Sequence, residues 1–314
     1  MDRHGLSYPQ LAARVFNRPW AIEPTAFQAV VSIFREHMLR RTRYAGEIEA
    51  DLIAAGVAAR APAMAASGAV RTIPIYGVLA NRADMITESS GMTSYESIGK
   101  QFDAAMNDVA VTDILFDVDS PGGTVEGLQE LSAKIYAARG TKRMTAIANP
   151  LAASAALYLA TSAERFYVTP SGMAGSVGTI AEHLDFSEAM AMEGVKATLI
   201  TSSQFKAEGN PYEPLGDEAA AELQRVVDDY GARFVNDLAR NRGTQAGRVR
   251  ADYGQGRMLL PDEAVRAGMA DGVKTYGEVL ASMGVIAGPG AARQASHWSV
   301  DLRQRMARLN EVLQ

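Results

Sequence analysis

The sequence contains no cysteine, and it has only four histidines among its 314 residues. Without cysteine the chain can form no disulfide, no thiolate nucleophile, no zinc–thiolate site and no iron–sulfur cluster. A nucleophile in this protein must therefore be a hydroxyl, an amine or a carboxylate. We expect neither a metal ion nor an organic cofactor.

Neither sign of charge dominates, because 31 lysines and arginines face 36 aspartates and glutamates, for a net charge of −5. This mildly acidic balance gives no overall electrostatic reason to bind nucleic acid. The basic run Arg40–Arg43 has no aromatic residues between its charges, so we interpret it as a solvated face. Apolar residues make up 47% and charged residues 21%, which is typical of a globular protein.

A long apolar run is also missing. The most apolar window, residues 146–163, is rich in alanine and is interrupted by Asn149, Pro150 and Ser154, which favours a buried helix over a membrane span. Residues 1–9 lack the basic start and the apolar stretch of a secretory signal. We therefore expect no membrane span and a chain that stays in the compartment where it is made.

Hydrophobic periodicity divides the chain into three regions. Residues 1–66 are predicted to be helical, with apolar residues at helical spacing between Phe27 and Phe34. Residues 67–283 alternate strands with helices over short connections, which predicts an α/β core with a largely parallel sheet. Residues 284–314 are predicted to form an amphipathic C-terminal helical extension. Within the core we expect strands at 73–79, 113–119, 144–148, 165–168 and 198–201, and helices at 125–138, 152–162 and 218–242.

A glycine motif follows the second of these strands. Ser120-Pro121-Gly122-Gly123 is expected to be a turn at the carboxyl edge of the sheet, where glycine lets an oxyanion approach the backbone amides closely. It is not a phosphate-binding loop, because no Gly-Lys-Ser/Thr follows. Turn formation alone would also account for the motif.

Ser154 is the candidate nucleophile. Asn149 and Pro150 are start signals for a helix, which would place Ser154 near the helix N-terminus, where free amides favour developing negative charge. The alternative is that Ser154 is simply a small residue that allows close helix packing.

A serine needs a base, and two candidates remain open. His183 with Asp185 could form a Ser-His-Asp arrangement. Lys206, just past the strand expected at 198–201, could act as a neutral amine if it were desolvated beside apolar groups. Arginine could not be deprotonated to do the same work.

Four short motifs together resemble the signal peptide peptidase A family of serine proteases, and above all its bacteriophage branch of capsid-assembly proteases. They are Ser120–Gly123, the alanine-flanked Ser154, Gly175–Gly178 and Ser203–Lys206, and the resemblance spans residues 70 to 280. It implies an α/β fold of the ClpP/crotonase type with repeated β-β-α units.

By this resemblance Ser154 is the nucleophile and Lys206, 52 positions later, is the general base. Gly122 and Gly123 would offer backbone amides to the oxyanion, and Ser176 would orient the lysine. One departure is that many cellular relatives have Ser-Gly-Gly at the nucleophile, where this chain has Ser-Ala-Ala. That difference leaves the dyad intact but weakens any transfer of substrate preference.

The resemblance implies a homo-oligomeric serine endopeptidase of phage or prophage origin, cleaving scaffold or capsid proteins inside an assembling procapsid in the host bacterial cytoplasm. No nucleic-acid partner is expected. One alternative is a cellular peptidase of the same family that degrades signal peptides or other peptides. Two others are a crotonase-like acyl-CoA enzyme, which would use a carboxylate base, and a non-catalytic capsid scaffold protein.

Overall fold

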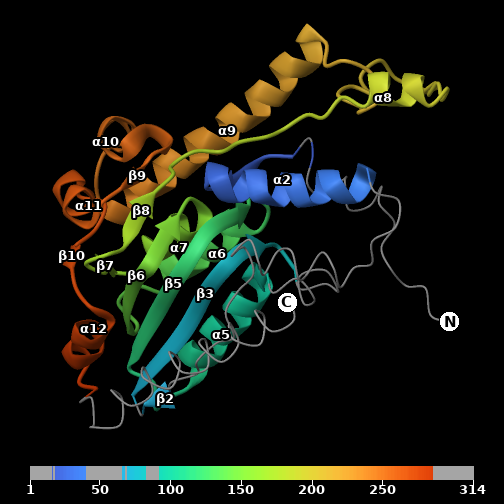
Figure 1. Cartoon of the computed structure of the whole chain (residues 1–314). Coiled ribbons are helices and arrows are strands. Elements are labelled where there is room, and N and C mark those ends of the chain that lie inside the picture. Colours follow the sequence, from blue (N-terminus) through green and yellow to red (C-terminus); the bar gives the residue numbers. More distant parts are fainter. Residues whose placement is uncertain (1–15, 17, 40–65, 68, 83–91, 286–314) are drawn as a thin grey trace, which may run out of the picture. The chain divides into compact units, whose positions relative to one another are not determined.

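The computed structural model describes residues 16, 18–39, 66–67, 69–82 and 92–285 (Figure 1). The chain divides into two compact units, residues 1–273 and 274–314. In the second unit, helix α12 (Tyr276–Ser282) is capped by Thr275, whose hydroxyl accepts a hydrogen bond from the Glu278 amide. The helical extension expected at 284–314 lies almost entirely outside the described residues.

The first unit is built on one sheet whose long strands run parallel, which confirms the expected α/β class. The buried residues of these strands are mostly apolar, with β-branched and aromatic side chains in β3, β5 and β7 and mainly alanine in β6, as is typical of a sheet covered on both faces. The parallel strands are β3 (Val70–Ala80), β4 (Thr93–Ser94), β5 (Asp113–Thr124), β6 (Arg143–Ala153), β7 (Arg165–Val168), β8 (Met173–Gly175) and β10 (Gly272–Val273). Three short strands pair antiparallel: β1 (Trp20–Ile22) with β5, β2 (Ala66–Ser67) with β3, and β9 (Met258–Leu259) with β8.

Helices pack on this sheet through the apolar core. Helix α7 is buried along its whole length, and α9 crosses it with its C-terminal half, where the Tyr158 and Phe234 rings lie 4.7 Å apart. The helices of the first unit are α2 (Pro24–Leu39), α5 (Tyr95–Asn107), α6 (Leu128–Ala137), α7 (Ala155–Ala160), α8 (Ser187–Met192), α9 (Asp217–Arg242), α10 (Ala246–Asp252) and α11 (Pro261–Ala267) (Figure 1).

Three expectations about local structure are wrong. The motif Ser120–Gly123 is not a turn, because β5 continues through it to Thr124, paired on one side with β3 and on the other with β1. Residues Thr198–Thr201 form no strand, since no neighbouring strand pairs with them and Ile200 is 94% exposed. The N-terminal region contains the helix α2 as expected, but β1 precedes it as an extended strand.

Asn149 and Pro150, which the sequence pattern predicts as helix-start signals, do not start a helix in the structure. Asn149 and Pro150 belong to β6, and α7 begins only at Ala155, with Ser154 as its N-terminal flanking residue. Ser154 is therefore at the start of a helix, as predicted. It also directly follows a strand that is longer than the sequence pattern predicts.

Arg139, just after α6, fixes the far end of α7. Its guanidinium donates hydrogen bonds to four backbone carbonyls, those of Thr161 (2.7 Å), Ser162 (2.9 Å), Ala163 (2.6 Å) and Asn241 (3.0 Å). These carbonyls follow the C-terminus of α7 and end α9, where unsatisfied backbone acceptors would otherwise be buried. One side chain thus ties α7, the helix that follows Ser154, to the long helix α9.

We expect Arg139→Met to lower the free energy of unfolding by about 2–4 kcal/mol, because four partly buried carbonyls lose their charged donor. Urea denaturation monitored by circular dichroism measures this loss. Arg225→Met is the matched control: Arg225 is exposed on α9 and pairs only with Glu222, so its loss should cost less than about 0.5 kcal/mol. Equal costs for the two variants would contradict this role of Arg139.

Candidate active site

Ser154 occupies a strained backbone conformation at the junction of β6 and α7, with φ 52° and ψ −116°. Its amide donates to the carbonyl of Gly175 at 2.9 Å, and its own carbonyl accepts from the Tyr158 amide at 2.9 Å. A serine on a sharp strand-to-helix turn is typical of a nucleophile, because the turn aims the hydroxyl away from both elements. Here that hydroxyl lies 3.5 Å from the carbonyl of Gly178, and the residue is fully buried.

The end of β5, residues 120–124, runs directly beside Ser154, and we call it the glycine strand. A Cβ on Gly122, whose φ is +103°, would lie 3.0 Å from the Ser154 Cβ, and one on Gly123 would lie 1.9 Å from the carbonyl oxygen of Leu79. Neither position can hold a side chain without moving the backbone. The Gly122 amide donates to the Ser120 hydroxyl at 3.2 Å, and that hydroxyl donates to the Gly77 carbonyl at 2.6 Å. The backbone of this strand therefore packs directly against the candidate nucleophile, with no side chain between them.

Ser176 lies on the other side of Ser154, one residue after the carbonyl that binds the Ser154 amide. It has a positive φ of 56°, is buried, and donates its amide to the Arg257 carbonyl at 3.0 Å. In the described part of the chain, only three non-glycine residues have positive φ, and two of them are Ser154 and Ser176. Backbone strain is thus concentrated at the predicted site.

Lys206 is not brought to Ser154 within one chain. Residues 191–206 are all exposed, and Lys206 lies in the segment between α8 and α9 (Figure 1). Within the described residues, its side chain makes no hydrogen bond or ion pair, and its amide donates to the Ser203 carbonyl at 3.2 Å. The structure therefore assembles Ser154, the glycine strand and Ser176, but leaves the predicted base elsewhere.

The alternative Ser-His-Asp arrangement gains no support from the geometry. The Ser154 hydroxyl has a carbonyl as its hydrogen-bond partner, and the Asp185 carboxylate accepts a hydrogen bond from the Ser187 amide at 2.8 Å. Hydrogen bonding from Ser187 also lowers the pKa of Asp185. Asp185 is therefore engaged in a local turn.

No sequence pattern predicts β1, yet this strand lies against the site. Trp20–Ile22 pairs antiparallel with Thr124, Gly123 and Gly122, and it forms a further antiparallel bridge with Ile180. The sequence could not have predicted this strand, because its partners lie about a hundred or more positions away along the chain.

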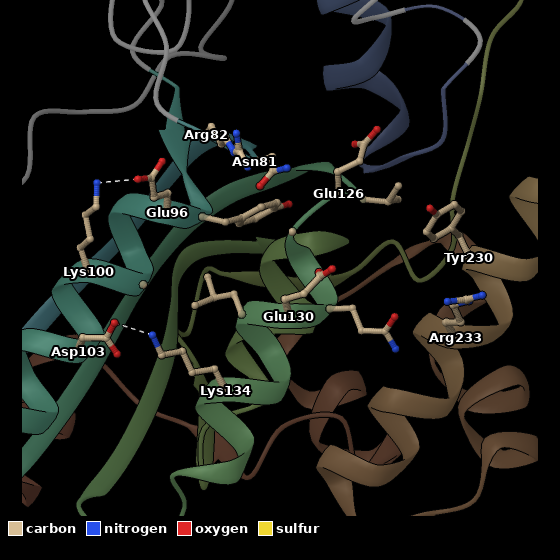
Figure 2. A pocket seen from close by; sticks show the side chains of 16 residues that line it. Asn81, Arg82, Glu96, Lys100, Asp103, Glu126, Glu130, Lys134, Tyr230 and Arg233 are labelled. Carbon is tan, nitrogen blue, oxygen red and sulfur yellow. Dashed lines mark hydrogen bonds and ion pairs between the residues drawn. The ribbon is translucent and has the colours of Figure 1, made fainter.

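A charged pocket of about 900 Å³ opens next to the end of the glycine strand, between α5, α6 and α9 (Figure 2). Figure 2 shows side chains of both signs around it, with ion pairs from Lys100 to Glu96 (2.7 Å) and from Lys134 to Asp103 (2.6 Å). These pairs leave the wall without one dominant charge. Among the described residues no cluster of three or more His, Asp or Glu side chains could hold a metal ion, and no helix is long and apolar enough to cross a membrane.

Beneath the glycine motif, a buried carboxylate joins β5 to its neighbours. Asp117 accepts hydrogen bonds from the Tyr76 hydroxyl (2.5 Å) and the Asn149 amide (3.1 Å). Burial raises the pKa of Asp117, while these two donors oppose the rise. The three side chains link β3, β5 and β6 just before the strands reach Ser154.

Comparison with known proteins identifies the domain. Residues 137–288, which include Ser154, Ser176 and Lys206, match the sequence profile of peptidase family S49. The chain therefore contains a peptidase S49 domain, and the mostly parallel α/β sheet is consistent with the ClpP-like fold expected for it.

Among similar proteins are two from phages. The chain is 30% identical over 275 residues to "Capsid assembly protease C" of Escherichia phage lambda, covering 84% of this chain and 62% of the relative. It is 28% identical over 280 residues to "Head-tail preconnector protein GP5" of Enterobacteria phage P21, covering 86% and 55%. A "Putative signal peptide peptidase SppA" of Enterococcus faecium is 24% identical over 213 residues, covering 67% and 61%. The chain thus spans less than two thirds of these relatives, and the resemblance to the signal peptide peptidase A family is confirmed.

Replacing Gly123 by alanine tests the close approach of the strands. The added Cβ meets the Leu79 carbonyl in the centre of the sheet, so we expect Gly123→Ala to lose about 2–4 kcal/mol of unfolding free energy. Gly247→Ala, in α10 with open space around it, should be neutral or slightly stabilising. Thermal or urea unfolding compares them, and a Gly123→Ala variant as stable as the parent would refute this packing.

The raised pKa of Asp117 predicts a pH dependence. A carboxyl whose pKa is raised on folding makes the folded state less stable as pH rises from the ordinary pKa through the raised one. Tyr76→Phe removes a donor to the charged form, so it should cost about 1.5–3 kcal/mol at pH 7 and clearly less at pH 4. Urea unfolding at both pH values measures the difference. Tyr212→Phe, at an exposed position, should show no such difference, and an equal cost of Tyr76→Phe at both pH values would contradict the prediction.

Proposed function

We propose that the protein is a serine endopeptidase in which Ser154 is the nucleophile and Lys206 the general base. The observation that carries the proposal is the strained, buried Ser154 beside a glycine strand within a peptidase S49 domain. A fold that keeps a serine at positive φ, with backbone instead of side chains packed around it, favours a reaction at that hydroxyl over a packing role.

In the proposed reaction the Ser154 hydroxyl attacks the scissile carbonyl as the neutral amine of Lys206 takes its proton. The lysine then gives this proton to the leaving amine, and water hydrolyses the acyl-enzyme by the same route. Backbone amides of the glycine strand would stabilise the oxyanion. In the structure the Gly122 amide binds the Ser120 hydroxyl, and Gly123 pairs with Ala21 of β1. Ser176 would orient the lysine from its buried position beside Gly175.

Lys206 would reach Ser154 from a second copy of the chain. The segment that contains it, residues 187–216, carries apolar side chains that are exposed to solvent in a single copy of the chain. Ile200 is 94% exposed and Met192 is 85% exposed. Such a surface is typical of an interface. Packing it against another copy would cover these side chains and desolvate the lysine, which favours the neutral amine that catalysis needs. The exposed apolar residues of this segment are Met192, Val195, Leu199, Ile200, Phe205 and Tyr212.

The substrates would be phage scaffold or capsid proteins, cleaved as the procapsid matures within the host cell. This assignment rests on the similarity to the lambda capsid assembly protease and to the P21 preconnector protein, together with the family profile. Mass spectrometry of capsid proteins co-expressed with the parent chain or with Ser154→Ala would identify new termini that depend on Ser154.

Mixing two inactive variants tests both the dyad and its assembly. Ser154→Ala and Lys206→Ala should each lower casein hydrolysis at least about 1,000-fold, because each removes one member of a unit that acts together. If each site takes its serine and its lysine from different copies, refolding the two variants together in equal amounts should restore about a quarter of the parent activity.

Lys196→Ala is the matched control, since Lys196 is another exposed lysine in the same segment, and its activity should match that of the parent. Activity retained by Ser154→Ala or by Lys206→Ala would refute the assignment of Ser154 and Lys206 as a catalytic dyad. Inactive single variants whose mixture stays inactive would place both groups in one copy.

A further inference from the structure

Strand β1 fills a narrow slot that passes the candidate nucleophile. We define the slot as the space between Gly122–Thr124 of β5 and Thr179–Ile180. On one side Trp20–Ile22 pairs antiparallel with the glycine strand, and the Glu23 amide continues the pairing by donating to the Pro121 carbonyl at 2.7 Å. On the other side Trp20 and Ile180 exchange two backbone hydrogen bonds, at 2.7 and 2.8 Å.

The middle of β1 lies next to Ser154. The position that a Gly122 Cβ would take is 2.3 Å from the Ala21 carbonyl oxygen and 3.0 Å from the Ser154 Cβ. Ala21 and Ser154 are both fully buried, so the candidate nucleophile has no access to solvent while β1 is in place. A protein substrate could reach Ser154 only after this segment had moved.

The slot has the chemistry of a peptide-binding groove. An extended peptide gains affinity from backbone hydrogen bonds to a strand edge, and pockets for alternate side chains supply specificity. The slot offers backbone partners along both sides of its occupant. Ala21 also lines a small pocket of about 20 Å³, together with apolar side chains such as Leu128 and Phe234 and polar ones such as Gln129 and Arg233. The small size of this space suits a small residue at that position.

The N-terminal segment can leave the slot without taking the main core apart. Trp20 and Ile22 belong to a separate apolar cluster, in which six of the seven buried members come from residues 16–31 and only Val78 comes from the long strands. Trp20 packs on Phe27 of α2, with ring centroids 5.9 Å apart. The segment is thus folded largely on itself, and only Ala21 is part of the main core.

We propose that the slot is the peptide-binding groove of Ser154 and that Trp20–Ile22 occupies it as an internal competitor of the substrate. The role of Ser154 in this statement rests on the proposed function. The occupation of the slot by β1 and its consequence for peptide binding do not require hydrolysis, so they can be measured separately.

A reversible disulfide lock tests the competitor in the full chain. Trp20 and Ile180 form a hydrogen-bonded antiparallel pair, whose Cα separation of about 5.5 Å suits a disulfide. The chain has no cysteine of its own, so Trp20→Cys with Ile180→Cys can form only this bond within one copy. Comparing the oxidised and reduced forms of one variant cancels the effect of losing the two native side chains.

The first readout is binding of fluorescein-labelled casein, an unfolded protein, to the lock variant in a Ser154→Ala background, followed by fluorescence anisotropy. We expect oxidation to weaken binding at least about tenfold and reduction to restore it. The second readout is casein hydrolysis by the lock variant with Ser154 intact, which should fall by a similar factor on oxidation. The single variants Trp20→Cys and Ile180→Cys should respond to neither treatment.

Equal casein binding by the oxidised and reduced forms would overturn the proposal, and so would a reduced form that binds no casein. Binding that follows the lock, in a chain whose Ser154-intact form never hydrolyses casein, would support the groove and its competitor while refuting the endopeptidase function. Hydrolysis that continues unchanged in the oxidised form would refute the competitor and leave the endopeptidase function standing.

Discussion

The site depends on the backbone conformation of one residue, Ser154. Positive φ at a serine costs on the order of 1–3 kcal/mol and persists only where the surroundings hold it. Here the Gly175 carbonyl fixes the amide, the first turn of α7 fixes the carbonyl, and the glycine strand fills the space beside the Cβ. Arg139 in turn anchors the far end of that helix. The position of the hydroxyl is thus set by main-chain hydrogen bonds and by the packing of a fully buried helix.

The same reasoning explains why so few side chains are needed around the hydroxyl. The neighbours of Ser154 are the backbones of Gly122, Gly175 and Gly178, and a Cβ at Gly122 or Gly175 would lie within 2.4 Å of a backbone oxygen. Backbone amides and carbonyls provide fixed dipoles that need no reorganisation during a reaction. A protein without cysteine and with four histidines can therefore still surround a nucleophile with preorganised polar groups of its backbone.

The spacing of apolar residues predicted those helices and strands whose buried face can be seen in their own sequence. The strands containing Ile73–Leu79 and Asp113–Asp119 and the long helix α9 were predicted within a few residues, because apolar spacing directly reports the buried face. The predictions failed where a distant partner decides the conformation. Ser120–Gly123 is extended because β1 and β3 flank it, whereas Thr198–Thr201 has apolar residues but no strand beside it.

The candidate residues divide in the same way. Ser154 could be found because helix-start signals and small neighbours lie close to it in the sequence, although the strand runs five residues further than those signals indicate. The pairing of Ser154 with Lys206 came only from family resemblance, and one copy of the chain does not bring the two together. Periodicity within one chain carries no information about a contact that a second chain would have to supply.

The two proposals impose separate conditions on hydrolysis, since a second copy must supply Lys206 and the substrate must displace β1. A competitor that belongs to the same chain as the slot acts at an effective concentration that can reach about a millimolar. A substrate in dilute solution would then bind more weakly than the same substrate crowded into a closed shell, where its concentration competes with the tethered segment. Activity would therefore be confined to an assembly that both orders the copies and concentrates the substrate, without a dedicated inhibitor. On this argument the short β1 and the exposed lysine segment would be the two features that make proteolysis depend on assembly.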